Sequence, residues 1–297
     1  MQPWIGVPFA TFIAPARVYC AVWRIAAVVL GFEIAFSLTP GLIAPFIEWN
    51  LPVESPILTL LDFAAFVLPA LALIGLIRLF HHRGLRTLVG PAQPFWRDLG
   101  RVLIAVCLVL LVQQPVLLWP DLPFVAQVRN PAIWALWLLP ALVAIAVQVS
   151  TEEIYFRGYL TQQLAVLSSY RRVWLLVPSV YFGGSHLLNG NGLADGVLWA
   201  AWAGALGAAC GDLTARTGNL GAAIGLHLGN NLFATVVIGV TNMPGSGLAL
   251  LLLPPEDVSL YTGALDTLWT PLTLLDVAVG GTGVAVMWLA ARVAVRA

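Results

Sequence analysis

The most constraining feature of this sequence is its succession of long apolar stretches, separated by segments rich in Pro, Gly or charge. Each is close to the roughly 20 residues that a helix needs to cross a bilayer. The apolar windows cover residues 18–39, 56–79, 102–119, 132–150, 173–189, 196–213, 219–240 and 274–291. With only 9% charged residues, the chain cannot cover itself in polar surface, because soluble domains carry about 25%. The sequence therefore predicts an all-α, polytopic membrane protein with about eight transmembrane helices in one membrane domain, residues 1–297.

Arginine placement predicts the orientation, because short loops rich in Lys or Arg stay on the cytoplasmic side of a membrane. Every basic residue of the chain is an arginine. An eight-span arrangement puts these on one side: Arg17, Arg83, Arg86, Arg97, Arg101, Arg171, Arg172, Arg216, Arg292 and Arg296. Between spans, the opposite side receives only Arg129. We therefore expect both termini in the cytoplasm, and the prokaryote-like composition suggests the inner membrane of a prokaryote.

Two other patterns concern connections and packing. The segment 243–271 has four prolines and acidic charges only (Glu256, Asp257 and Asp266), so we expect a loop with room for a short helix on the membrane surface. Small residues recur in the seventh window (Gly221, Gly225 and Gly229) and in the sixth (Gly204, Ala208 and Gly211). Such spacing is typical of close helix contacts in membranes.

Ionisable groups within the apolar windows need a partner, a water-filled cavity or a function, because each costs about 3 kcal/mol at membrane depth. Arg157 follows Glu153 by four residues, so the two share a helical face with the acid before the base. Arg157 can therefore hold Glu153 ionised. Glu152 is turned about 100° away on a helix, so it is free of that partner and available as a general base.

Two histidines and an asparagine complete the candidate site. His227 and Asn231 are four residues apart and share one helical face. Glu153 and His186 are nearly equidistant from Tyr170, at the centre of a basic turn between the fourth and fifth windows. An antiparallel helix pair about that turn would bring them to one depth.

The remaining ionisable groups in or beside the windows stand alone. Arg24, Asp62, Asp212 and Asp276 are expected to lie at the interface or to form hydrogen bonds between helices. Glu33 is deeper in its window and has no predicted partner.

The polar residues resemble the motifs of the CAAX prenyl endopeptidase and bacteriocin-processing family, also called CPBP or Abi intramembrane proteases. The family pattern is Glu-Glu-x-x-x-Arg, then Phe-x-x-x-His, then His-x-x-x-Asn. This chain meets it in order, without departure at a motif position, through Glu152, Glu153, Arg157, Phe182, His186, His227 and Asn231. The resemblance covers a core of about residues 140–240.

The resemblance implies a fold around a polar intramembrane cavity open to the cytoplasm, and peptide-bond hydrolysis as the activity. By analogy, Glu152 and His186 activate the attacking water, while His227 and Asn231 stabilise the oxyanion. Glu153 completes the catalytic set. Arg157 supports Glu153. Phe182 lies one turn before His186 and would form an apolar side of the site.

Zinc is the alternative to a metal-free mechanism. His186, His227 and either Glu152 or Glu153 would make an acceptable zinc set with water in the open position. However, the chain has no His-Glu-x-x-His helix, and Asn is a poor zinc ligand. We therefore favour a mechanism without cofactor, dependent on glutamate.

Two other classes of function use buried Glu and His. A non-catalytic binding, immunity or scaffold protein of the same fold is disfavoured by the intact set of five residues. A proton-coupled transporter is disfavoured because the sequence has no convincing internal repeat. The expected partners are the lipid bilayer and a membrane-embedded or lipidated peptide or protein substrate, and no nucleic acid.

Overall fold

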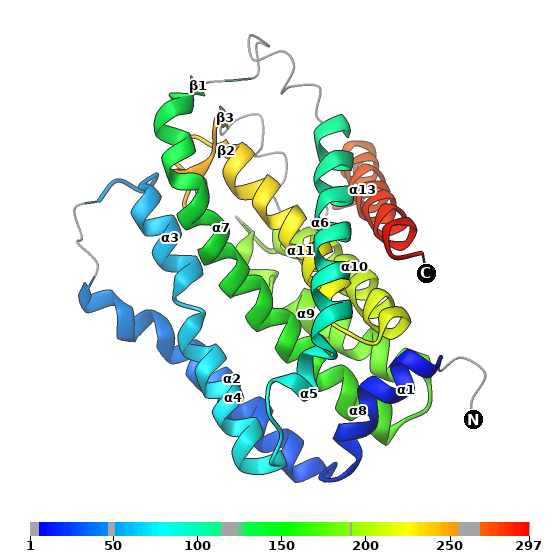
Figure 1. The fold of residues 1–297 in the computed structure, drawn as a ribbon. Coiled ribbons are helices and arrows are strands. Elements are labelled where there is room, and N and C mark those ends of the chain that lie inside the picture. Colours follow the sequence, from blue (N-terminus) through cyan, green and yellow to red (C-terminus); the bar gives the residue numbers. More distant parts are fainter. Residues whose placement is uncertain are drawn as a thin grey trace.

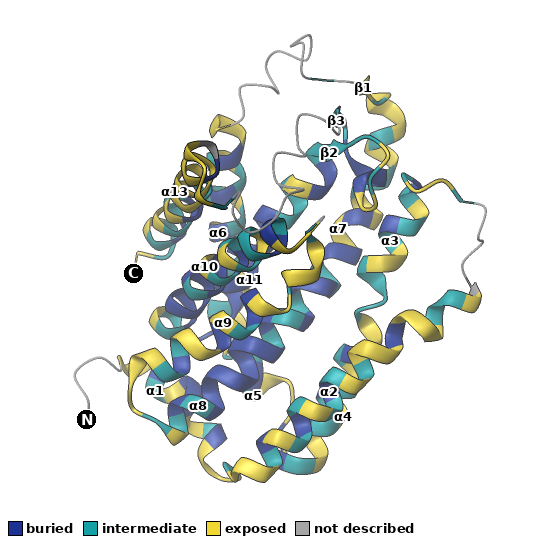
Figure 2. Ribbon diagram, turned by 180° about the vertical axis from the view of Figure 1, so that it is seen from behind, coloured by how far each residue is buried: buried dark blue, intermediate teal, exposed yellow. Residues whose placement is uncertain are grey.

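Helices dominate the computed structural model of this protein, which describes residues 6–46, 51–113, 125, 127–190, 192–254 and 268–296 (Figure 1). The long helices form a bundle, with a small sheet at one end and the short helices α1, α5 and α8 at the other. Burial is concentrated in the middle of the bundle, whereas α2, α4 and α13 expose much of their surface (Figure 2). This distribution is expected where the outer surface faces lipid, and it agrees with the predicted all-α membrane class.

The first half of the chain supplies mostly outer helices: α1 (Val7–Ile13), α2 (Val22–Ile43), α3 (Pro56–Ala64), α4 (Val67–His81), α5 (Arg86–Val89) and α6 (Ala92–Gln113). Short 3-10 turns cover Ala14–Arg17, Ala44–Phe46, Leu187–Asn189 and Ser246–Leu248. Pro56 occupies the first turn of α3, where a missing N–H costs nothing. Together α3 and α4 make one apolar run, Pro56–His81.

The helix α7, Pro131–Glu153, carries both carboxylates. The side chain of Asn130 accepts the backbone N–H groups of Ala132 and Ile133 at 2.9 and 3.3 Å, which caps the helix start. Helical structure continues through a π-helical segment, Ile154–Leu160, into α8, Thr161–Leu167. The predicted window 132–150 was therefore too short. The part of the helical run beyond residue 150 contains charged and amide side chains, so its hydropathy is low. Residues 155–163 are nevertheless all buried against other parts of the protein, and hydropathy alone could not predict that the helix continues there.

The helix α11, Gly221–Leu232, lies at the centre and is buried from Gly221 to Asn230. A Cβ on Gly225 would lie 2.8 Å from the backbone oxygen of Leu99 in α6, and one on Gly221 would clash with the Phe95 oxygen. The predicted close contact is therefore confirmed, with α6 as the partner.

Two further helices pack beside this centre. A π-helical segment, Arg172–Leu176, leads into α9, Val177–Gly184, and α10 covers Leu193–Thr217. A Cβ on Gly204 of α10 would lie 3.5 Å from the Ser179 oxygen of α9. The small residues of the sixth window therefore also mark a close helix contact.

A three-stranded sheet was not predicted. It comprises β1 (Gln127–Val128), β2 (Ile238–Val240) and β3 (Leu251–Leu253), in the order β1-β3-β2. β3 pairs antiparallel with β1 (Val128↔Leu251) and parallel with β2 (Ile238↔Leu251). The seventh window was thus wrong at its end, because helical structure stops with the π-helical segment Phe233–Val237. Ile238 and Val240 favour strand geometry, and β3 supplies a partner from the segment expected to be a loop.

Five helices in the described ranges are long and apolar enough to cross a membrane: Val22–Ile43, Pro56–His81, Pro131–Leu167, Leu193–Thr217 and Thr273–Val295, the last within α13 (Pro271–Val295). Gly221–Val237 is a shorter apolar helix. Each of the eight windows overlaps a helix, but the count of eight spans is not confirmed. In the fifth window, the 5-residue segment Arg172–Leu176 and the 8-residue α9 would rise about 20 Å, less than the roughly 30 Å of a bilayer core. The window end 114–119 and the acidic residues Glu256, Asp257 and Asp266 lie outside the described residues.

Candidate active site

Glu153 forms the buried centre of the polar cluster. Its Oε1 lies 2.8 Å from Nη1 of Arg157 and 2.9 Å from Nδ1 of His227. The exposed fractions of Glu153, Arg157 and His227 are 0%, 1% and 2%. Because a carboxylate can only accept, both contacts are charge-assisted hydrogen bonds donated to Glu153. The predicted pair of Glu153 and Arg157 is therefore present, and it also fixes the ring of His227.

Glu152 has the different environment that the spacing predicted. Its side chain is 13% exposed, and its Oε2 lies 3.6 Å from Nε2 of His227. That separation is too long for a hydrogen bond, and Oε2 is a buried atom without a hydrogen-bond partner among the described residues. The two adjacent carboxylates thus flank the same imidazole: Glu153 bonds Arg157 and His227 through Oε1, whereas Glu152 forms no hydrogen bond with another described residue.

Asn231 contacts a residue that the sequence analysis missed. Its Nδ2 donates to Oε1 of Gln148 at 3.1 Å, and its Oδ1 accepts from Nδ2 of Asn230 at 3.1 Å. Gln148 lies on α7 four residues before Glu152 and is buried, with an exposed fraction of 6%. Gln148 was not predicted as a site residue, because it carries no charge and lies outside the motifs of the resembled family. Its spacing of one helical turn from Glu152 is the signal that could have revealed it.

His186 follows the end of α9 at the rim of this cluster. Its Nδ1 donates to the backbone oxygen of Phe182 at 2.8 Å, which leaves Nε2 as the free nitrogen of the neutral ring. The Phe182 ring lies between the two histidines, with centroids 4.6 Å from His186 and 5.6 Å from His227. Arg157 also stacks on Phe182, at 4.7 Å. Among the described residues, His186 is therefore joined to the acids through the aromatic ring, without a direct hydrogen bond to them.

Zinc coordination by the site residues is the alternative to a metal-free site. In the ranges that the structure covers, no group of three His, Cys, Asp or Glu is arranged to hold a metal ion. Within the proposed zinc set, Glu153 is the donor least suited to a metal. His227 Nδ1 is bonded to Glu153, and the Arg157 guanidinium beside Glu153 opposes a second cation there. His227 Nε2, His186 Nε2 and Glu152 Oε2 remain the donors of the zinc alternative.

Three of the remaining ionisable residues have partners, and two lie on the surface. Glu33 of α2 accepts hydrogen bonds from the hydroxyls of Tyr155 and Tyr181, beside the site helices. Asp212 joins three segments through Arg171, Arg216 and Trp288, as expected for a bond between helices. Arg24 donates to the backbone oxygen of Phe80 at 2.7 Å. Asp62 and Asp276 are exposed.

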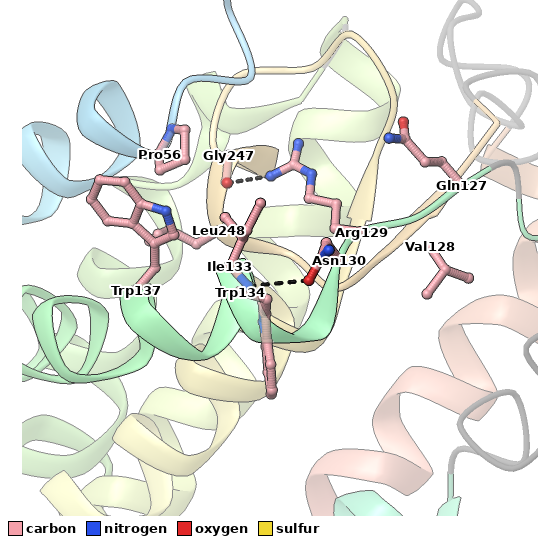
Figure 3. A pocket seen from close by; sticks show the side chains of 10 residues that line it. All are labelled: Pro56, Gln127, Val128, Arg129, Asn130, Ile133, Trp134, Trp137, Gly247 and Leu248. Carbon is pink, nitrogen blue, oxygen red and sulfur yellow. Dashed lines mark hydrogen bonds between the residues drawn. The ribbon is translucent and has the colours of Figure 1, made fainter.

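A cavity of about 270 Å³ is lined by β1 and the first turns of α7, at the sheet end of the bundle (Figure 3). Trp134, Trp137 and Arg129 contribute to its lining. Arg129 donates to the backbone oxygen of Gly247 and pairs with Glu54 at 2.9 Å. The lining includes none of the predicted catalytic residues, and Arg129 is already paired with Glu54.

The comparisons with known proteins agree with the motif resemblance. Residues 132–233 match the type II CAAX prenyl endopeptidase Rce1-like family, and this segment contains all seven motif residues. The predicted family resemblance is therefore confirmed for this part of the chain. The uncharacterized protein YyaK of Bacillus subtilis (strain 168) is 27% identical over 179 residues, 59% of this chain and 59% of YyaK. The chain thus spans about three-fifths of that relative's length. No solved structure matches significantly.

Proposed function

We propose, from the Rce1-like character of residues 132–233, that this protein is an intramembrane endopeptidase of the CAAX protease type. The single observation that carries the proposal is the arrangement of Glu152, Glu153 and His227. One buried carboxylate is neutralised and orients the imidazole, while the second faces the same imidazole with an unbonded oxygen. Two acids in different environments beside a histidine are typical of general acid–base catalysis.

In the proposed mechanism Glu152, assisted by His186, takes a proton from water as the water oxygen attacks the peptide carbonyl carbon. The same proton is then delivered to the leaving nitrogen, and the C–N bond breaks. The unbonded Oε2 of Glu152 and the free Nε2 of His186 support these roles.

His227 and Asn231 are the proposed oxyanion donors. Nδ1–H of His227 is already bonded to Glu153. In the proposed mechanism the ring carries a proton on Nε2 as well, and this Nε2–H donates to the oxyanion. Asn231 uses one amide hydrogen for Gln148 and has another to offer. Fixed donors in a water-poor site are worth about 10²–10³ in rate each.

The proposed mechanism uses no metal. The substrate proposed is a membrane-associated or lipidated protein or peptide, since helices long and apolar enough to cross a membrane carry the acids and substrates reach such a site from the bilayer. We propose a multi-pass location in the inner membrane of a prokaryote, with both termini in the cytoplasm. A non-catalytic immunity or scaffold role would leave the unbonded Glu152 beside His227 without a purpose.

The test is quantitative proteomics of membrane-protein N- and C-termini from cells with wild-type protein or with Glu152→Gln. New termini should depend on wild-type protein, and fluorogenic peptides built from them should be cleaved by the purified enzyme in detergent. Glu152→Gln and His186→Ala should each abolish turnover with the melting temperature close to that of the wild type, because glutamine keeps the shape of the Glu152 side chain and His186 lies outside the buried Glu153–Arg157 pair. Identical termini in both strains would refute the protease proposal.

The metal dependence of hydrolysis is tested on the same purified enzyme. Active enzyme should contain far less than one equivalent of zinc, and strong chelators should leave the hydrolysis rate unchanged. About one equivalent of zinc, lost with activity in His186→Ala and required for turnover, would overturn the metal-free mechanism and leave the protease function standing.

A further inference from the structure

The polar contacts between α7 and α11 form two levels separated by one helical turn. At one level Glu152 and Glu153 face His227, with the shorter contact at 2.9 Å. At the next, Gln148 faces Asn231 at 3.1 Å. The helices run antiparallel at this contact, because Gln148 precedes Glu152 by four residues and Asn231 follows His227 by four. The amide pair therefore lies directly beside the acid–histidine pair, on the same helical faces.

The contacts of Asn231 define which end of its amide is the donor. Asn230 Nδ2 donates to its Oδ1, and Gln148 Oε1 accepts from its Nδ2, both at 3.1 Å. A side-chain amide turned by 180° has nearly the same shape but exchanges its donor and acceptor ends. A turned Asn231 would present its oxygen to a developing oxyanion, which is repulsive where the amide hydrogen is attractive.

We infer that Gln148 is a positioning residue of this enzyme, which holds the Asn231 amide with its donor toward the substrate carbonyl. The inference rests on the proposed peptide hydrolysis and deepens it. Gln148 acts through Asn231 and does not touch the reacting atoms. Its 6% exposure excludes a solvent-facing role, and a neutral acceptor suits the position, because a carboxylate there would repel the oxyanion.

The test is a double-mutant cycle of Gln148→Met and Asn231→Ala, with kcat and KM measured on a cleaved peptide. Methionine keeps the length of glutamine and removes the acceptor. Gln148→Met should lower kcat by about 10- to 100-fold, as for a misplaced catalytic group, with KM within about twofold. In the Asn231→Ala background the same change should cost less than about twofold, because the group it positions is gone.

The matched control is Gln163→Met. Gln163 is a buried glutamine on the same helical run, but its amide lies against His81 at 3.5 Å. The kcat of its folded fraction should equal that of the wild type. The inference would be overturned if the kcat losses of the two single variants multiplied in the double variant. It would also be overturned if Gln148→Met had an unchanged kcat and a lower melting temperature, because the contact would then be purely structural. A wild type without hydrolysis refutes the proposed function and this role together, whereas normal turnover in Gln148→Met refutes the role alone.

Discussion

At the scale of single residues, the site separates two neighbouring carboxylates by what each one contacts. Oε1 of Glu153 bonds both Arg157 and His227, whereas Glu152 forms no hydrogen bond with a described residue; each carboxylate has one buried oxygen without a partner. Removing one partner of a buried ion pair leaves an uncompensated charge, which typically costs about 3–5 kcal/mol. The stability of the fold and the chemistry of the site are therefore linked through Glu153.

Arg157→Ala should unfold the protein at a much lower temperature and abolish activity, because it strands the Glu153 carboxylate. The expected loss is about 3–5 kcal/mol of unfolding free energy, measured by thermal or chemical denaturation in detergent. Arg172→Ala is the control, since Arg172 is exposed and should change stability by less than about 0.5 kcal/mol. An active Arg157→Ala protein with an unchanged melting temperature would show that the ion pair is dispensable.

At the scale of elements, α9 is held against α10 by glycine. A Cβ on Gly183 would clash with the Ala200 backbone oxygen and lie 3.2 Å from the Gly204 backbone. The next residue, Gly184, has nothing within 4 Å of such a Cβ. Because Phe182 and His186 flank this pair of glycines, the distance between α9 and α10 sets the position of both site residues.

Gly183→Ala should therefore force α9 away from α10 and displace His186. We expect a loss of about 1–3 kcal/mol, as in other overpacked sites, and a fall in kcat of about 100-fold, as for a group misplaced by about 1 Å. Gly184→Ala should keep wild-type activity and a stability within about 1 kcal/mol. Melting temperatures and turnover of both variants check the prediction, and equal behaviour of the two would contradict the tight contact.

At the scale of the whole molecule, the proposed orientation follows from the arginines and can be tested directly. In a variant without Cys20, Cys107 and Cys210, single cysteines are placed at two exposed positions, Ser169 and Gln127. A membrane-impermeant maleimide added to intact cells should label Gln127→Cys, on the side of the lone Arg129, and leave Ser169→Cys unlabelled until the cells are lysed. Labelling of Ser169→Cys alone would reverse the topology, and labelling of both would contradict the number of crossings between them.

The sequence by itself determined the membrane class, the helix-rich fold and the residues of the motifs. Apolarity over about 20 residues leaves few alternatives to a membrane helix, and the spacings from Glu153 to Arg157 and from His227 to Asn231 are local properties of a helix. The close packing of Gly221 and Gly225 was predictable for the same reason.

Only the tertiary structure decided which faces meet. It placed Gln148 opposite Asn231, Glu33 beside Tyr155 and Tyr181, and Ile238–Val240 against β3. Gln148 and Glu33 lie far from their partners in the chain, and the rotation of a helix about its axis is set by packing against several neighbours at once. An apolar pattern indicates that a segment avoids water, but it does not say whether lipid or protein covers the segment. The predicted end of the helical window was therefore wrong beyond α7, where charged and amide side chains are buried by other helices.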